Sequence, residues 1–295
     1  MARRMWQRGP DGEIVRAPTA PEEAVSALGP VGSPRPPGRA HLGLAFRLGA
    51  RDTYDYLGTL LLQSFVWTVL VALGLLGGQA AGVALTGSLP PRLGAFLSLL
   101  LAGVAGVALG SPITAGIFRY ARNAAARLEP ELFDLAWGFR SGFRRALGLG
   151  ALQAFGVLLL AGNCYFYLAQ RLPVLVVVGA AFGYLLAFWG LACLYQWPLL
   201  VEQELTPLAA AKKSALLVLD NFLFTLAVGV VVLLLTVVCW ATVLGGALLW
   251  AGMTAMLLTQ LTRELLRKYG VLGPDPTLDP IAGETHELRG LGHHE

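Results

Sequence analysis

Long stretches without a charged side chain dominate the hydrophobic pattern of this chain. These stretches are residues 56–91, 93–118, 146–170, 172–201 and 221–262. Because a helix of about 20 apolar residues crosses a hydrocarbon layer about 30 Å thick, each stretch can hold a transmembrane helix. The last stretch is long enough for two helices, and Gly245–Gly246 is the predicted turn between them, since glycine accepts the backbone angles of a tight turn. The first combines one helix with a Gly-rich loop that ends at Pro91.

The pattern therefore predicts an all-α fold, a polytopic transmembrane helix bundle of six spans. The predicted spans are residues 57–78, 95–117, 147–168, 174–198, 219–241 and 246–264. The basic residues near the span ends on one side are Arg47, Arg51, Arg119, Arg122, Arg127, Arg140, Arg144, Arg145, Lys212, Lys213, Arg263, Arg267 and Lys268. The other side has Arg92 and Arg171. Basic residues beside spans are retained in the cytoplasm, so this asymmetry predicts that both termini are cytoplasmic.

Composition agrees with a membrane protein. Hydrophobic residues make up 56% of the chain and charged residues 14%, and the mean hydropathy is +0.63. The net charge of +4 does not indicate nucleic-acid binding, because the basic residues border apolar stretches instead of forming one basic face on a soluble domain. The excess of arginine over lysine is typical of a GC-rich bacterial genome. We therefore expect the bacterial inner membrane as the location and membrane lipids as partners.

The two ends of the chain differ from the part between them. Residues 1–44 are rich in Pro, Gly and Arg and carry too few large apolar residues to offset the entropy of ordering, which predicts a disordered cytoplasmic tail. Residues 270–295 predict a second flexible cytoplasmic tail, and residues 45–269 the transmembrane domain. The histidines are His41, His286, His293 and His294. Their surroundings favour a solvated tail over a metal site, and the three cysteines form no CxxC motif.

Two cytoplasmic connections have amphipathic patterns. In residues 131–147, apolar residues recur at helical spacing with arginines between them, which predicts a helix on the membrane surface or beneath the bundle. The second connection begins at Thr206, a predicted N-cap, with Pro207 at the first helical position. Both connections follow a span with a proline near its inner end, Pro112 or Pro198, and each proline is predicted to kink its helix.

Three segments carry a family resemblance. They are "GSPITAGIFRYARNA", "LFDLAWGFRSGFRRALGLG" and "LYQWPLLVEQELTPLAAAKKSALLVLDNFLFTL". Together they resemble the successive signature segments of the YesL-like family of bacterial multi-pass membrane proteins of unknown function, over residues 43–269. The positions that match the family pattern are Gly110, Pro112, Phe133, Asp134, Gly138, Phe139, Phe143, Tyr195, Pro198, Asp220 and Asn221. The chain departs from the pattern in its long N-terminal tail, in Ser111 between the glycine and the proline, and in a longer first extracytoplasmic loop.

The resemblance implies a multi-pass fold and names no biochemical activity. Members of the family are often encoded beside carbohydrate uptake systems, which implies an accessory role near such a system. Catalysis is disfavoured by the residues themselves, because no set of nucleophiles, acids or metal ligands converges in the pattern. We therefore expect neither an enzyme nor a cofactor.

The arginines between the second and third predicted spans are candidates for docking a partner or for contact with lipid headgroups. They are Arg119, Arg122, Arg140, Arg144 and Arg145. Their first interpretation is as determinants of orientation that also rest on anionic headgroups. The alternative is an anionic-ligand site, in which the guanidinium groups would converge on one pocket.

The predicted spans contain few polar groups. The candidates for lining a polar cavity are Gln63, Gln153, Asn163 and Gln196. Hydrogen bonds between helices are the favoured interpretation of these amides. The candidate helix-packing or kink residues are Gly106, Gly110, Pro112, Gly179, Gly183 and Pro198. GxxxG spacing lets helices approach closely, and packing within one chain explains the glycines as well as dimerisation does, so the oligomeric state stays open.

Two functions are compatible with these features. The favoured one is an accessory or scaffold subunit associated with a membrane transport complex, and the resemblance points to carbohydrate uptake. The alternative is a passive channel or transporter for a small polar or neutral solute, which would use the amides of the spans.

Overall fold

The computed structural model of the chain describes residues 6–8, 14–16, 42–170 and 172–272. Residues 40–266 form one compact unit. The segments Trp6–Arg8 (β1) and Ile14–Arg16 (β2) pair as a two-stranded antiparallel sheet, an element that composition did not predict. Apart from these two strands and residues 42–44 and 270–272, the two predicted tails lie outside the described residues, and so do the four histidines.

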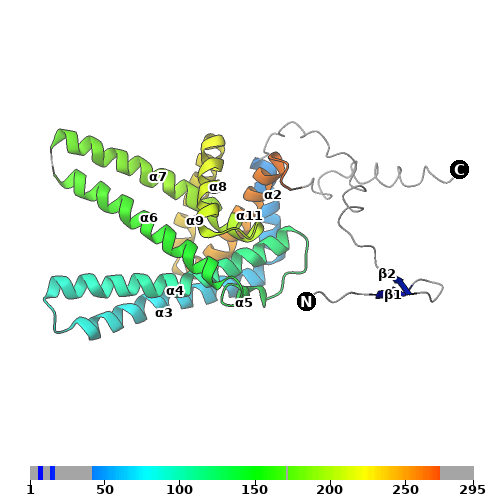
Figure 1. The fold of residues 1–295 in the computed structure, drawn as a ribbon, viewed down its shortest axis with the longest axis horizontal. Coiled ribbons are helices and arrows are strands. Elements are labelled where there is room, and N and C mark those ends of the chain that lie inside the picture. The colour runs from blue at the N-terminus through cyan, green and yellow to red at the C-terminus, as the bar shows by residue number, and fades with distance from the viewer. Residues whose placement is uncertain (1–5, 9–13, 17–41, 171, 273–295) are drawn as a thin grey trace. The chain divides into compact units, whose positions relative to one another are not determined.

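The regular elements described in the compact unit are helices (Figure 1). They are α2 (Leu42–Asp55), α3 (Leu57–Thr86), α4 (Pro91–Ala125), α5 (Asp134–Trp137), α6 (Phe143–Ala169), α7 (Pro173–Glu202), α8 (Pro207–Asp220), α9 (Phe222–Ala241), α10 (Val243–Leu248) and α11 (Trp250–Lys268). Within the described residues, five helices are long and apolar enough to cross a membrane, namely α3, α4, α6, α7 and α9. The prediction of a helical, multi-pass membrane protein is confirmed at this level.

The helices follow one another as three pairs. In the first two pairs, α3 packs on α4 and α6 packs on α7, and both pairs extend toward the same side in Figure 1. The third pair is α9 and α11, which the short α10 connects. We call the end at which α4, α7 and α11 finish the inner end, and the opposite end, with the turn at residues 87–90, the outer end.

Helix α3 continues to Thr86, which corrects the prediction of a Gly-rich loop after residue 78. Gly74, Gly78 and Gly82 lie inside the helix and face α4. A Cβ atom on Gly78 would lie 2.8 Å from the Cα of Ala102, and one on Gly74 would lie 2.7 Å from the carbonyl oxygen of Ala105. The glycines therefore serve close packing between two helices, which stabilises helix in a membrane, instead of forming a loop.

The predicted sixth span, residues 246–264, is not confirmed. Gly245 and Gly246 lie within α10, so they do not form the predicted turn. The hydroxyl of Thr68 donates to the carbonyl of Ala247 at 2.9 Å. Thr68 lies about 16 Å along α3 from its start, and α3 extends about another 27 Å beyond it, at a rise of about 1.5 Å per residue. The third pair therefore turns back well before the outer end of α3.

Helix α11 differs from the five long apolar helices in its polar content. It carries buried Thr259, Gln260 and Glu264 among its buried leucines. The hydrophobic pattern alone did not separate it from a span, because its charged residues begin only at Arg263.

The two inner connections gave different outcomes. Helix α8 begins as predicted: Pro207 is its first residue, and the hydroxyl of Thr206 accepts a hydrogen bond from the N–H of Ala209 at 3.4 Å. The single helix predicted for residues 131–147 is wrong, because the chain forms the four-residue α5 and starts α6 only at Phe143. This segment packs against α4 so closely that a Cβ atom on Gly116 would lie 2.8 Å from the Cα of Leu135, and that approach interrupts a continuous helix.

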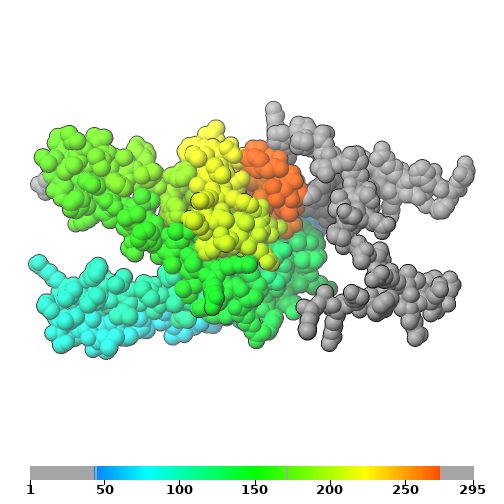
Figure 2. All heavy atoms as spheres, viewed as in Figure 1, coloured from blue at the N-terminus to red at the C-terminus, as the bar shows by residue number. Residues whose placement is uncertain are grey.

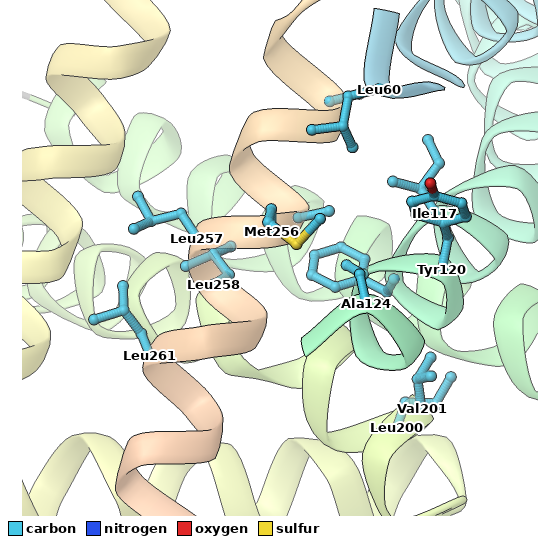
Figure 3. Packing of buried hydrophobic residues seen from close by; sticks show 14 of the residues in the cluster. Leu60, Ile117, Tyr120, Ala124, Leu200, Val201, Met256, Leu257, Leu258 and Leu261 are labelled. Atoms are coloured by element: carbon cyan, nitrogen blue, oxygen red, sulfur yellow. The ribbon is translucent and has the colours of Figure 1, made fainter. Parts of the chain in front are cut away.

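The hydrophobic core lies in the inner half of the unit. Met256 and Leu258 of α11 point toward the side on which Tyr120 of α4 and Leu200 of α7 lie, whereas Leu257 and Leu261 lie on the opposite side of α11 (Figure 3). Helix α11 is therefore the central element around which the inner ends of the other helices pack.

Candidate functional site

Charged residues from all three helix pairs meet at the inner end. Glu202 closes α7, and its Oε1 lies 3.0 Å from Nη1 of Arg263 on α11. Its Oε2 lies 3.8 Å from Nε of Arg122 on α4. The side chain of Glu202 is only 7% exposed, so the two guanidinium groups compensate a carboxylate that burial would otherwise destabilise. We call Arg122, Glu202 and Arg263 the inner triad.

A second buried carboxylate joins the beginning of the compact unit to its end. Asp52 of α2 is fully buried. It accepts hydrogen bonds from the amide of Gln260 on α11 and from Nη1 of Arg127, the latter at 2.8 Å. Three segments that are far apart in sequence therefore meet at one aspartate.

Arg127 reaches Asp52 through an unusual backbone conformation. Its φ is 57°, in the left-handed region that favours glycine. The N–H groups of Arg127 and Leu128 bond to the carbonyls of Ala124 and Asn123, which is the Schellman ending of a helix. Glycine is usual at this position, and the arginine that stands here instead places its side chain on Asp52.

A third carboxylate holds α5 against α4. Asp134 accepts a hydrogen bond from the amide of Asn123 at 2.8 Å, and its other oxygen lies 3.5 Å from Nε of Arg119. The guanidinium of Arg119 also lies 4.9 Å from the ring centre of Trp137. These contacts fasten the connection that the close approach of Gly116 brings against α4.

The structure separates the five arginines that the sequence grouped together. Arg119 and Arg122 pair with Asp134 and Glu202, as described above. Arg140 lies over the ring of Phe133 at 4.6 Å, and Arg145 lies 3.6 Å from Glu204. Arg144 is exposed. These residues do not converge on one pocket, so the arrangement does not match a single anionic-ligand site.

The candidate cavity residues also have separate positions. The amide of Gln153 on α6 donates to Gln196 on α7 at 2.9 Å and accepts from the indole of Trp197 at 3.0 Å. Asn163 donates to the carbonyl of Leu159 in its own helix. Gln63 is fully buried, and neither polar atom of its amide has a hydrogen-bond partner within the described part of the chain. Gln153 and Gln196 thus form a bridge between helices, and Gln63 does not.

The candidate packing glycines contact neighbouring helices of the same chain. Cβ atoms on Gly106 and Gly110 would lie 2.8 Å and 3.2 Å from side chains of α3. Cβ atoms on Gly179 and Gly183 would lie 2.9 Å and 3.6 Å from side chains of α6. Pro112 and Pro198 lie inside α4 and α7, which continue through them.

Sequence reasoning missed the acidic half of this network. Neither Asp52 nor Glu202 was among the residues that the sequence singled out. One signal was available: Glu202 and Arg122 follow the predicted spans 174–198 and 95–117 by four and five residues, and Arg263 lies near the end of the predicted span 246–264. Opposite charges at the same depth of a bundle are candidates for pairing.

No three His, Cys, Asp or Glu side chains in the described ranges are placed to hold a metal ion. A comparison with family models, curated proteins and solved structures found no match to this chain. The resemblance to the YesL-like family therefore stays a prediction carried by the sequence motifs.

Proposed function

We propose that this chain is a non-catalytic scaffold subunit of the bacterial inner membrane that associates with a membrane transport complex. One observation carries the proposal: two long helix pairs are held together at their inner ends and leave their outer halves exposed. Figure 2 shows a hollow between the α3–α4 pair in cyan and the α6–α7 pair in green. A rigid inner core with separate apolar arms suits a protein that positions neighbours in a membrane.

The charged network supports this proposal over a catalytic one. The charges of the inner triad pair with one another, and Asp52 pairs with Arg127. Because the carboxylates of Glu202 and Asp52 are buried, each pairing is important for stability. Removing one partner of a buried pair typically costs about 3–5 kcal/mol. The network therefore acts first as a structural link between the three helix pairs.

The outer halves supply the surface for neighbours. Large apolar side chains such as Leu99, Leu158 and Tyr184 are more than half exposed there. Exposed apolar faces on long helices are covered in a membrane by lipid or by helices of another subunit. The resemblance to the YesL-like family makes a carbohydrate uptake system the first partner to examine.

The proposed orientation places the inner end in the cytoplasm. Basic residues gather at that end, in agreement with the distribution of charge in bacterial membrane proteins. Asp52, near the start of the compact unit, contacts Gln260 in the middle of α11, and α11 finishes at the inner end, so both ends of the compact unit lie on that side. This holds whether the third pair crosses the whole membrane or turns back within it.

Site-specific photo-crosslinking in living cells tests the scaffold function. Two tyrosines of α7 form a matched pair: Tyr184 is 80% exposed and Tyr195 is fully buried. We expect a benzophenone amino acid at Tyr184 to crosslink a subunit of a membrane transporter, identified by mass spectrometry, and the same amino acid at Tyr195 to give no intermolecular product. Crosslinks from Tyr184 only to lipid, with none from Leu99 or Leu158, would contradict the proposal.

Gln63 is the observation that favours the alternative, a passive path for a small solute. A buried amide without a partner is costly unless water or a solute reaches it. If the path exists, reconstituted vesicles should show solute flux that Gln63→Leu abolishes. If the scaffold function holds, wild-type vesicles show no flux above empty ones and Gln63→Leu leaves the Tyr184 crosslink unchanged.

A further inference from the structure

Helix α8 exposes an unusual combination of residues. Its buried side consists of small residues, Ala210, Ala211, Ser214 and Val218, which lets it lie close to its neighbours. Its exposed side carries leucines and lysines, which are Leu208, Lys212, Lys213, Leu216 and Leu219. The three leucines are each about 60% exposed, so the side that faces away from the protein is both apolar and basic.

This combination fits a membrane interface better than water. The exposed leucines are eight and three residues apart, spacings that share one face of a helix, and they form an apolar stripe that is unfavourable in water and favourable at the boundary of the acyl chains. Lysine stems can lie along such a stripe while the ammonium groups reach the headgroup layer. Helix α8 also connects two candidate spans, α7 and α9, which places it near the membrane surface.

The first turn of α6 adds two arginines beside α8. Arg145 lies 3.6 Å from Glu204, just before α8, and Nζ of Lys213 donates to Gln203 at 2.7 Å. A Cβ atom on Gly148 of α6 would lie 3.0 Å from the ring of Pro207, the first residue of α8. We call Arg144, Arg145, Lys212 and Lys213 the inner basic surface.

Positive charge on this surface exceeds the negative charge beside it. Glu204 pairs with Arg145, and because the first is exposed and the second half-exposed, this ion pair is weak. Glu202 is already paired with Arg122 and Arg263, and Asp220 lies at the far end of α8. The first turn of α6 has no acidic residue and no side-chain cap, and two arginines there oppose the helix dipole. A bound anion would relieve that repulsion.

We propose that the inner basic surface binds the phosphate of an anionic phospholipid, whose acyl chains lie along the leucines of α8. The apolar stripe selects a lipid over a free anion, because inorganic phosphate would gain nothing from the leucines. Arg119 and Arg122 take no part, since Asp134 and Glu202 already engage them. The inference rests on the membrane location in the proposed function and is independent of the transport partner.

Lipid retention by the purified full-length chain tests this proposal. The protein in a neutral detergent is mixed with equal amounts of phosphatidylglycerol and phosphatidylcholine, and the lipids that co-elute on gel filtration are quantified by mass spectrometry. We expect wild type to be enriched in phosphatidylglycerol. The variant R144Q/K212Q/K213Q should lose about tenfold or more of that enrichment, since each basic group near an anionic surface contributes on the order of fivefold.

The matched control removes three exposed basic groups elsewhere, in R47Q/R51Q/R92Q. It should keep the enrichment to within about twofold, because its net charge changes equally but the inner basic surface is intact. Equal loss in both variants, or no loss in the first, would overturn the proposal. Should the triple variant lose its helical circular dichroism, Lys212→Gln alone must lower the enrichment by about fivefold.

Two further measurements distinguish this proposal from a site for a soluble anion and from the scaffold function. Inorganic phosphate, at the concentration of the lipid, should not displace phosphatidylglycerol, and displacement would assign the surface to a soluble anion instead. The Tyr184 crosslink lies on an outer arm and should persist in R144Q/K212Q/K213Q. If R144Q/K212Q/K213Q loses the lipid enrichment and keeps the crosslink, the lipid surface is supported. If the wild type forms no crosslink, the scaffold function is contradicted and the lipid surface is not.

Discussion

Arg127 and Glu204 are the non-glycine residues with left-handed backbone conformation in the described part of the chain, with φ values of 57° and 48°. Each follows the end of a long helix, where glycine is common. Their side chains differ in environment: Arg127 pairs with fully buried Asp52, whereas Glu204 pairs with half-exposed Arg145. The cost of the backbone conformation is therefore offset by a buried contact at one residue only.

We predict opposite effects for glycine at these two positions. Arg127→Gly relieves the backbone by about 1 kcal/mol but leaves the Asp52 carboxylate without its cation, which costs about 2–3 kcal/mol. The midpoint of thermal unfolding in detergent should fall by about 3–6 °C.

Glu204→Gly is the control for that experiment. It removes an exposed ion pair of little value and relieves a similar backbone conformation, so the midpoint should stay constant or rise slightly. Equal destabilisation by the two substitutions would show that the Asp52 contact has no special role.

At the scale of helices, the α3–α4 pair depends on glycines that face the partner helix. Gly78→Ala places a methyl group 2.7 Å from the carbonyl oxygen of Leu101 and 2.8 Å from the Cα of Ala102. Because these are backbone atoms, the helices must separate, and we expect a loss on the order of 1–3 kcal/mol. Unfolding by a denaturing detergent, followed by circular dichroism, measures this loss.

The adjacent glycine provides the control. A Cβ atom on Gly77 meets nothing within 4 Å, so Gly77→Ala should be neutral or should stabilise the helix by up to about 1 kcal/mol. If Gly78→Ala proved as stable as Gly77→Ala, close packing would not be what holds this pair together.

At the scale of the whole molecule, the inner and outer ends should face different compartments. In a background where Cys164, Cys193 and Cys239 are replaced by serine, Ser88→Cys in the outer turn should react with an impermeant thiol reagent added to intact cells. Glu129→Cys, after α4 at the inner end, should react only after the cells are opened, because the basic inner end is retained in the cytoplasm. Labelling of both positions in intact cells would refute the orientation.

Local chemistry was sufficient for several features of this protein. A stretch of about 20 residues without charge forms a helix in a membrane, because the hydrocarbon layer has no water to bond to the backbone and a helix pairs its own N–H and C=O groups. The positions of α6, α7 and α9 followed from it closely. The start of α8 was also readable, since the hydroxyl of Thr206 and the ring of Pro207 act within one turn.

Contacts between distant segments decided the rest. Gly78 continues a helix instead of opening a loop because Ala102, 24 positions later, occupies the space beside it. Arg122 pairs inside the protein while Arg144 faces outward, although both are arginines near span ends, because Glu202 lies beside only the first. Helix α11 became the central, buried helix because its polar side chains find partners on α2 and α7. Such outcomes depend on which groups folding brings within a few ångströms, and spacing along the chain does not encode that distance.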